Sequence, residues 1–266
     1  MQWIATVKPA QMQRLQMLPC HNEIQIKPSM KLKYLLSSAA GLAMMVVFSG
    51  CLKNTPIEPT KPASYVSVLN MSFRSPAVEM LFGAEKVTAP ISGGMYFPRY
   101  NNITPGFIDI SFKKASSDSV VAQLQTGLYY DSLTYYSVLL YDKDAGGAGV
   151  IRIKDEFPMA DPSRSFVRFF HMAPGQPQVD VQINNTRVFT SRTQADNTYN
   201  SSYNQFSGVT PGSFPIVIKQ AGTDSVIAST PYSDLSAGGI YTLVLKGTTA
   251  GTGSGALGIE LIRAAN

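Results

Sequence analysis

The chain has 266 residues, of which 44% are hydrophobic and 15% are charged, so it is too apolar to be wholly disordered. It contains 13 Phe and 13 Tyr, and low charge with many aromatic residues is typical of secreted β-proteins. The formal net charge of +5 does not indicate a nucleic-acid partner, because residues 1–50 hold most of the excess and no cluster of Lys and Arg follows them.

Residues 30–50 have the layout of a secretory signal peptide. Lys31 and Lys33 form a positively charged start, an apolar run covers residues 35–48, and two small residues precede Cys51. This apolar run is shorter than the roughly 20 residues that a membrane-spanning helix needs. The segment therefore predicts export rather than a membrane span.

The ending Phe-Ser-Gly-Cys, residues 48–51, resembles the lipobox of bacterial lipoproteins. The resemblance implies that Cys51 receives acyl chains such as palmitate, becomes the mature N-terminus and anchors the protein to the outer membrane of the cell envelope. Several acyl chains hold a protein firmly on a bilayer, whereas one chain does so only marginally. A plain signal peptide with an incidental cysteine is the alternative. The sequence leaves open whether the protein faces the periplasm or the exterior.

Residues 1–29 fit no part of this arrangement, and we expect them to be an over-extended, unstructured start that precedes the true start at Met30. Cys20 would be lost with them, so the mature chain would keep Cys51 alone and could form no internal disulfide. Residues 51–63 contain three prolines in quick succession, which predicts a stiff, extended tether.

The rest of the chain aligns with itself, which indicates an internal repeat. The stretch YVSVLNMSFRSPAVEMLFGAEKV from Tyr65 aligns without gaps on FVRFFHMAPGQPQVDVQINNTRV from Phe166. Further on, ITPGFIDISFKKASSDSVVA from Ile103 aligns on VTPGSFPIVIKQAGTDSVIA from Val209, with ten of twenty positions identical. We therefore expect two copies of one domain. The first covers residues 64–154, the second covers residues 165–266, and residues 155–164 link them.

Within each copy, apolar and polar residues alternate with a period of two, as in half-buried strands. Tyr241, Leu243 and Leu245, for example, alternate with Thr242, Val244 and Lys246, and we expect polar alternates to face solvent. Short strands separated by turn sequences predict two tandem immunoglobulin-like β-sandwiches, with a partly closed barrel as the alternative. The expected inward-facing residues are Val78, Met80, Phe82, Ile108, Ile110 and Phe112 in the first copy, and Val179, Val181, Ile183, Phe214, Ile216, Ile218, Leu243 and Leu245 in the second.

The start of the second copy, with its VRFFHMAPGQPQVDV stretch, resembles a bacterial family known as domain-of-unknown-function family 4397. The resemblance is closer over residues 165–263 than over residues 64–154. It implies a β-sandwich in a secreted or lipid-anchored envelope protein, notably of Bacteroidetes. It implies no catalytic residues.

His171 is the only histidine beyond residue 21, and Asp180 follows on the next expected strand. The first copy has Asn70 at the position of His171, and an Asn can replace a hydrogen bond of an imidazole but not its proton transfer. We therefore expect a structural or turn-fixing role for His171 and a solvent-facing position for Asp180. A single His without a paired Cys, His or close carboxylate is also a poor metal site.

Two motif-like strings do not indicate a cofactor. Residues 253–258 read G-S-G-A-L-G. A dinucleotide-binding fold needs a helix and then an acidic residue well beyond such a string, and the residues that follow here do not provide them. Residues 146–149 match the string in the first copy. We expect both to be hairpin loops. Residues 142–146 resemble the start of a calcium loop, but the twelfth position is Ile153 rather than Glu. We expect no cofactor and no metal.

No nucleophile or metalloprotease motif marks the chain as an enzyme. We expect a non-enzymatic binding, adhesion or structural module on the lipid anchor, with a protein or glycan as partner. A spacer without any ligand is one alternative. The other is an envelope hydrolase or an accessory protein of glycan processing, because a pair of catalytic carboxylates has no fixed sequence spacing.

Two sets of residues are candidates for interaction or modification. The expected long connections 93–102 and 193–206 carry tyrosines, which suit recognition on loops above a rigid sandwich: Tyr96, Tyr100, Tyr199 and Tyr203. The alternative is that half of these rings belong to a shared buried strand. Three Asp-Ser-apolar triplets resemble O-glycosylation acceptors of Bacteroidetes envelope proteins, with the acceptors at Ser119, Ser132 and Ser225.

Overall fold

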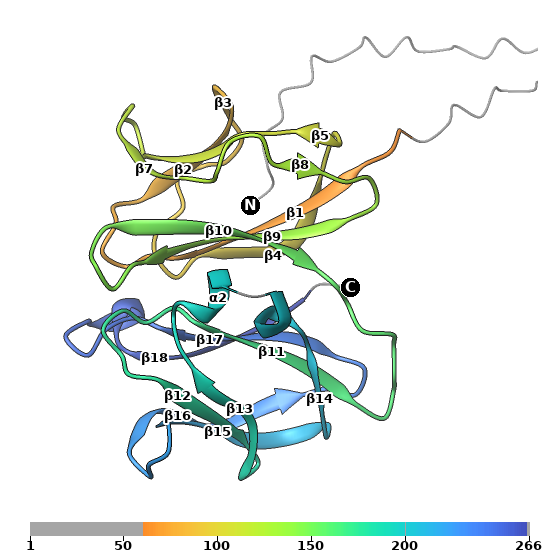
Figure 1. Cartoon of the computed structure of the whole chain (residues 1–266), viewed down its shortest axis with the longest axis vertical. Helices are drawn as coiled ribbons and strands as arrows, with labels where there is room; N and C mark the ends of the chain where they lie inside the picture. The colour runs from red at the N-terminus through yellow and green to blue at the C-terminus, as the bar shows by residue number, and fades with distance from the viewer. Residues whose placement is uncertain (1–60, 200, 265–266) are drawn as a thin grey trace, which may run out of the picture. The chain divides into compact units, whose positions relative to one another are not determined.

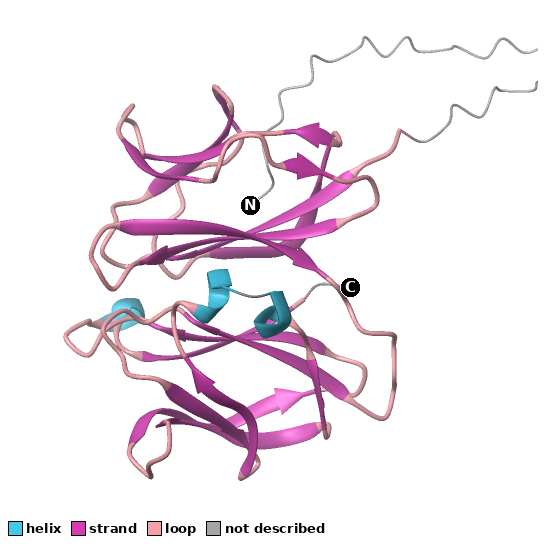
Figure 2. Ribbon diagram, in the orientation of Figure 1, coloured by secondary structure: helices cyan, strands magenta, loops and turns pink. Residues whose placement is uncertain are grey.

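The structure, a computed structural model, describes residues 61–199 and 201–264. The expected signal peptide, Cys51 and most of the tether lie outside these residues. The described chain is built almost entirely of strands (Figure 2). Its helical parts are short: α2 (Asp196–Tyr199), η1 (Ser201–Asn204) and η2 (Gly253–Gly255). The expectation of an all-β protein is confirmed. In this part of the chain, no helix is long and apolar enough to cross a membrane.

The first repeat consists of two four-stranded sheets and a short two-stranded sheet (Figure 1). One sheet has the order β10-β9-β1-β4, the other has the order β3-β2-β6-β7, and β5 pairs with β8. The strands are β1 (Ser64–Met71), β2 (Val78–Phe82), β3 (Glu85–Lys86), β4 (Tyr96–Ile103), β5 (Gly106–Phe107), β6 (Ile110–Lys114), β7 (Val120–Gln123), β8 (Tyr129–Tyr130), β9 (Tyr135–Asp142) and β10 (Ala148–Asp155).

The second repeat has the same strand order, because its sheets are β18-β17-β11-β14 and β13-β12-β15-β16. Its strands are β11 (Ser165–His171), β12 (Val179–Ile183), β13 (Thr186–Arg192), β14 (Ser207–Val209), β15 (Gly212–Gln220), β16 (Val226–Leu235), β17 (Ile240–Lys246) and β18 (Gly258–Arg263). The first strand of each repeat pairs in parallel with the strand before the last, β1 with β9 and β11 with β17. No sheet closes into a barrel, so the sandwich is confirmed.

Each sandwich encloses its own hydrophobic core, formed largely by the alternating residues that the sequence marks. β-Branched and aromatic residues dominate these faces, as expected for half-buried strands. Of the expected inward residues, Phe82, Ile108 and Phe214 are only partly buried but still pack against the cores. The others are buried: Val78, Met80, Ile110, Phe112, Val179, Val181, Ile183, Ile216, Ile218, Leu243 and Leu245.

A tyrosine fixes the same corner in both repeats. The Tyr136 hydroxyl accepts a hydrogen bond from the main-chain N–H of Asp131 at 3.0 Å. The Tyr241 hydroxyl accepts one from the N–H of Ser236, also five residues upstream, at 2.8 Å. Immunoglobulin-like sandwiches use a comparable tyrosine corner. The equivalence of the two corners supports the internal repeat at the level of single hydrogen bonds.

The outer faces of two sheets do not face solvent. Side chains from β10-β9-β1 and from β11-β17-β18 form a third apolar core: Leu69, Met71, Leu139, Tyr141, Ile151, Ile153, Phe170, Met172, Val244 and Ile262. The polar alternate Thr242 is also buried. The expectation that polar alternates on strands face solvent was therefore wrong here, because the two sandwiches pack on each other. The chain from Pro62 onward forms one compact unit.

A buried polar network accompanies this third core. Arg168, on β11, forms an ion pair with Asp155, at the end of β10. The Arg168 guanidinium also donates to the hydroxyls of Thr242 at 2.9 Å and Ser137 at 3.1 Å. The linker is tied to the same region, since the Phe157 ring packs edge-on against Tyr100 at 5.8 Å between centroids.

Candidate functional site

A cavity of about 440 Å³ opens at one end of the first sandwich. It lies between the β2–β3 hairpin and the end of β4, which are not hydrogen-bonded to each other because β3 and β4 are both edge strands. The cavity is lined mainly by apolar side chains: Val66, Phe82, Val87, Ile103, Phe107 and Ile108. A mostly apolar cavity of this volume is typical of a small-ligand site.

The second repeat has a counterpart of about 360 Å³ at the equivalent place. The repeat alignment pairs Phe82 with Ile183 and Val87 with Val188, and all four residues line the two cavities. The cavity is thus a feature of the fold, formed where the two sheets separate at their edge strands. The linings differ in the sign of their charged residue, because the first cavity includes Glu85 and the second includes Arg187.

The rims of the two cavities also differ. Phe107, 75% exposed, lies at the rim of the first cavity, and its ring contacts Tyr129 edge-on with 5.1 Å between centroids. The strand pairing places Ser213 and Asp234 at these two positions of the second repeat. The first repeat therefore presents aromatic rings where the second presents polar side chains.

The first cavity offers contacts for binding rather than a pair of groups for acid–base catalysis. Among the described residues that line it, Glu85 is the one ionisable group, and Asn101, Asn102 and Thr104 supply neutral polar atoms. Acid–base hydrolysis of a glycosidic bond needs two carboxyl groups that flank the bond. An apolar group with few polar contacts suits this lining better.

Tyr96 and Tyr100 do not lie on a loop, which corrects the expected long connection at residues 93–102. Both belong to β4, which pairs only with β1 and so tolerates Pro98 at a sheet edge. The Tyr100 hydroxyl donates to Asp155 at 2.8 Å, and burial together with this carboxylate raises the pKa of Tyr100. Tyr96 is half-buried and lies 3.5 Å from Glu260, and burial raises its pKa as well.

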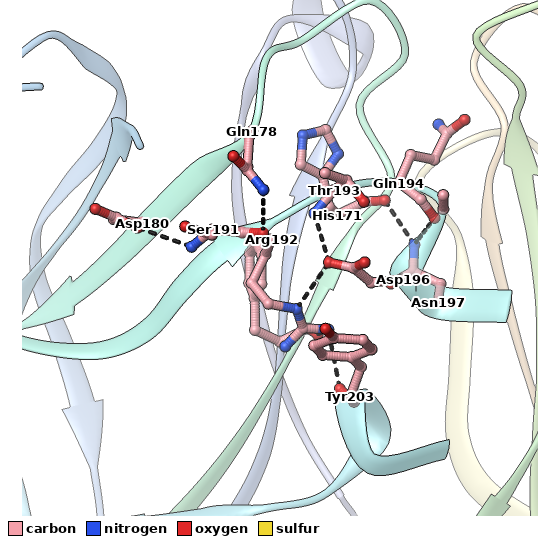
Figure 3. Close-up of polar contacts among 12 residues, drawn as sticks. His171, Gln178, Asp180, Ser191, Arg192, Thr193, Gln194, Asp196, Asn197 and Tyr203 are labelled. Atoms are coloured by element: carbon pink, nitrogen blue, oxygen red, sulfur yellow. Dashed lines mark hydrogen bonds and ion pairs between the residues drawn. The ribbon is translucent and has the colours of Figure 1, made fainter. Parts of the chain in front are cut away.

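The segment 193–206 contains two short helical turns, α2 and η1 (Figure 3). Tyr203 is 37% exposed, and its ring lies 4.8 Å from the guanidinium of Arg192. Arg192 also donates to the main-chain oxygen of Tyr203 at 2.9 Å. Tyr199 ends α2, and its side chain lies outside the described structure. The side chains of Tyr96, Tyr100 and Tyr203 make contacts within the chain rather than forming one exposed cluster.

His171 ends β11, and its ring contacts the turn that follows this strand. Its side chain is buried, and Nε2 lies 3.3 Å from the main-chain oxygen of Pro177. Burial lowers the pKa of His171, so the ring is neutral near pH 7. Asn70 occupies the same place in the first repeat and donates to the main-chain oxygen of Ile91 at 3.0 Å. His171 lines neither cavity.

Asp180 is buried, contrary to the expected solvent-facing position. Its carboxylate accepts a hydrogen bond from the main-chain N–H of Ser191 at 2.8 Å and lies 3.4 Å from Nε of Arg187. The pairing of β12 with β13 is irregular on both sides of Val181, so the neighbouring backbone covers this position. The alternation along β12 does not reveal this coverage.

The three candidate acceptor serines are all exposed. Ser119 and Ser225 lie in equivalent turns, directly before β7 and β16. The aspartate before each one pairs with a lysine, Lys113 with Asp118 at 3.2 Å and Lys219 with Asp224 at 3.0 Å. Ser132 lies in the turn between β8 and β9. All three are therefore accessible for modification.

Both glycine-rich strings lie at hairpin connections, as the sequence predicts. Residues 146–149 lie at the β9–β10 connection, residues 253–258 lie at the β17–β18 connection, and both strand pairs are antiparallel hairpins. Asp142 is buried, and its carboxylate accepts hydrogen bonds from the Ser72 hydroxyl and the Phe73 N–H. Within residues 61–199 and 201–264, no group of three or more His, Cys, Asp or Glu side chains is placed to hold a metal ion.

Residues 64–182 match a family described as a domain of unknown function, DUF4397. This part of the chain is similar to the DUF4397 family. The match contains the whole first repeat and ends within β12, whereas the closer resemblance was expected over residues 165–263. No curated protein matches the chain. The DUF4397 description names no activity, so the argument for function depends on the geometry of the repeats.

Two features of this geometry were not predicted from the sequence. The cavity depends on which strands lie at sheet edges, and no local motif encodes that. The buried Arg168–Asp155 pair lies at the contact between the sandwiches, and its signal is the run VRFFHM around Arg168. A strand that is apolar on both sides of its pleat is buried on both faces, so a charge within it needs a buried partner.

Proposed function

We propose that the protein is a non-enzymatic binding module of the bacterial cell envelope, held on the outer membrane by lipid at Cys51. The binding site is the cavity of the first repeat, and its ligand is a small molecule with an apolar group. One observation carries this proposal: both repeats keep the cavity, but only the first combines it with an exposed aromatic pair, Phe107 and Tyr129. The second repeat then serves as support for the first.

The anchor part of the proposal is supported by the charged start, apolar run and Phe-Ser-Gly-Cys ending of residues 30–51. Labelled palmitate and membrane fractionation test it, with Cys51→Ala as the variant. The native chain is expected to carry label and to sediment with membranes, and the variant is expected to lose both. Unchanged labelling and sedimentation of the variant would rule out this anchor.

The ligand part is tested with an apolar fluorescent probe, 1-aminoanthracene, and competition by alkanols of increasing length. Val87→Phe fills the first cavity, and Val188→Phe is the matched control because Val188 is the equivalent lining residue of the second. Probe binding is expected to fall in Val87→Phe and to persist in Val188→Phe. Equal binding in both variants would place the probe elsewhere.

A structural spacer is the second candidate, and the packing of the two sandwiches favours it. The shared third core and the buried Arg168–Asp155 pair fix one sandwich on the other, as a rigid arm requires. Proximity labelling from the native envelope separates the candidates. Probe binding that Val87→Phe removes supports the ligand site, whereas no probe binding together with no labelled partner supports the spacer.

A further inference from the structure

Three large apolar side chains gather, exposed, at one end of the first repeat. Phe107 and Leu133 are each 75% exposed, and Tyr129 is 49% exposed. Phe107 and Tyr129 are opposed on the paired strands β5 and β8 with ring centroids 5.1 Å apart, and Leu133 lies in the turn that follows β8. These three residues are called the tether-side patch below. Exposed contiguous apolar surface marks a contact with a partner or a membrane.

The patch lies beside the point where the chain joins the first sheet. The main-chain N–H of Leu133 donates to the oxygen of Ala63 at 2.7 Å, and Ser64 donates to the oxygen of Tyr130 at 3.2 Å. Figure 1 shows β5 and β8 at the same end of the repeat as the start of β1. Ala63 is 12 positions after Cys51. Since a residue spans at most about 3.6 Å, an anchor at Cys51 keeps this end within roughly 43 Å of the bilayer.

Leu133 is in an unfavourable backbone conformation in addition to being exposed. Its φ is 57°, in the left-handed region that costs an L-residue about 1–2 kcal/mol. The equivalent turn of the second repeat has Gly238, with φ 71°, and its N–H donates to the oxygen of Arg164 at 2.7 Å. The fold therefore accepts Gly at this position. A strained, exposed leucine in the first repeat needs a reason other than folding.

The other two patch residues show the same contrast. Phe107 corresponds to Ser213, and Tyr129 corresponds to Asp234, both exposed in the second repeat. Because the two repeats share one strand order, this end of the sandwich can fold without apolar side chains. All three replacements in the second repeat are the ordinary choice for a solvated turn or strand end. The apolar set is specific to the repeat that carries the tether.

We propose that the tether-side patch inserts into the interface of the bilayer that holds the acyl chains of Cys51. This inference rests on the anchor of the proposed function. Aromatic side chains favour the membrane interface, and the anchor raises the local concentration so that a small contact suffices. Two nearby charged side chains are held by hydrogen bonds within the chain, which permits the contact. The Asp131 carboxylate accepts a hydrogen bond from Tyr136, and Arg152 donates to the main-chain oxygen of Tyr129 at 2.6 Å.

The test places a tryptophan reporter in the patch of the full, acylated chain. The one tryptophan of the sequence, Trp3, lies before Cys51 and is absent from a chain acylated at Cys51 as its N-terminus, so the background is silent. The reporter is Phe107→Trp, and Tyr232→Trp is the matched control because Tyr232 is 76% exposed in the second repeat. The protein is reconstituted into vesicles of phosphatidylethanolamine and phosphatidylglycerol with brominated acyl chains. The emission of Trp at 107 is expected to shift to the blue and to be quenched, and that at 232 is not.

A second variant makes the result specific to the patch. Leu133→Gly with Tyr129→Asp installs the residues of the second repeat, and the reporter at 107 is then expected to lose its quenching while the chain stays folded and vesicle-bound. A vesicle-bound chain whose reporter at 107 is no more quenched than that at 232 overturns the patch contact and leaves the anchor intact. A chain without acyl mass at its N-terminus that fails to float with vesicles overturns the anchor itself.

Discussion

Arg168 and Asp155 form an ion pair in which the two side chains are 4% and 0% exposed, and each comes from a different sandwich. The guanidinium is also covered by rings, with Phe170 at 5.0 Å and Phe206 at 4.8 Å from their centroids. The second carboxylate oxygen of Asp155 accepts hydrogen bonds from Tyr100 and Ser137. The pair is thus desolvated, with hydrogen bonds to both its cation and its carboxylate, and it orients one sandwich on the other.

Removing one member of this pair should destabilise the protein strongly. Arg168→Met leaves the Asp155 carboxylate buried without its cation, which is expected to cost about 3–5 kcal/mol. The double variant Arg168→Met, Asp155→Leu removes both charges and is expected to be more stable than the single variant. Urea unfolding followed by circular dichroism measures both. A single variant with the midpoint of the parent would mean that the pair contributes nothing to the contact.

His171 should make the stability depend on pH. Burial lowers the pKa of the folded His171 below its ordinary value of 6.5, so the unfolded chain binds more protons in the acidic range. Its contribution is therefore complete above about pH 6.5 and is lost as pH falls through that value toward the folded pKa. Urea midpoints at pH 7.5 and pH 5.5 measure the loss.

The control for this prediction is His171→Asn, because Asn70 holds the equivalent turn of the first repeat. The variant is expected to lose most of the change between the two pH values, since carboxylates titrate mainly below this range. An unchanged difference between pH 7.5 and pH 5.5 in the variant would show that another group is responsible.

The sequence predicts strands well where one face is buried and the other is not. Val179, Val181 and Ile183 alternate with polar residues, and all three are buried in the second core. The same logic fails for Val244, because its strand is covered on both faces. Which faces meet is a long-range property that local alternation does not contain. The one sequence signal of this contact is the apolar run around Arg168, which indicates a strand buried on both faces.

The candidate site was harder to predict than the fold. Tyr100 was expected on a loop, because Pro98 and the polar residues after it hide the strand, yet an edge strand tolerates proline. The turn-fixing expectation for His171 agrees with its contact to Pro177, since Asn70 shows that the position needs no proton transfer. The cavity and the tether-side patch become visible only when the two repeats are compared position by position in space.

Mass spectrometry of the chain from its native envelope should find O-linked glycan on Ser119 and Ser225, which are both exposed. Ser119 and Ser225 occupy equivalent turns, so both are expected to be modified or both to be bare. Ser132 is exposed in a different turn, directly before Leu133 of the tether-side patch, so it is expected to stay bare in chains whose patch contacts the bilayer. Substituting each serine by alanine should remove the added mass from its own peptide alone. Unmodified peptides at all three sites would show that the triplets are ordinary turn sequences.

Leu133 and Gly238 allow a direct measurement of how much unfolding free energy the first repeat loses by having a leucine at its tether-side turn. Leu133→Gly relieves the left-handed strain but gains chain entropy in the unfolded state, so its unfolding free energy is expected to stay equal or to rise by up to about 1 kcal/mol.

Gly238→Leu imposes the strain and is expected to lose about 1–2 kcal/mol, although a Cβ at Gly238 meets no atom within 4 Å. Urea unfolding of both variants in solution, without vesicles, provides the comparison. If Leu133→Gly instead lost stability by as much as Gly238→Leu, the leucine would be part of the fold, and its exposure would need no membrane to explain it.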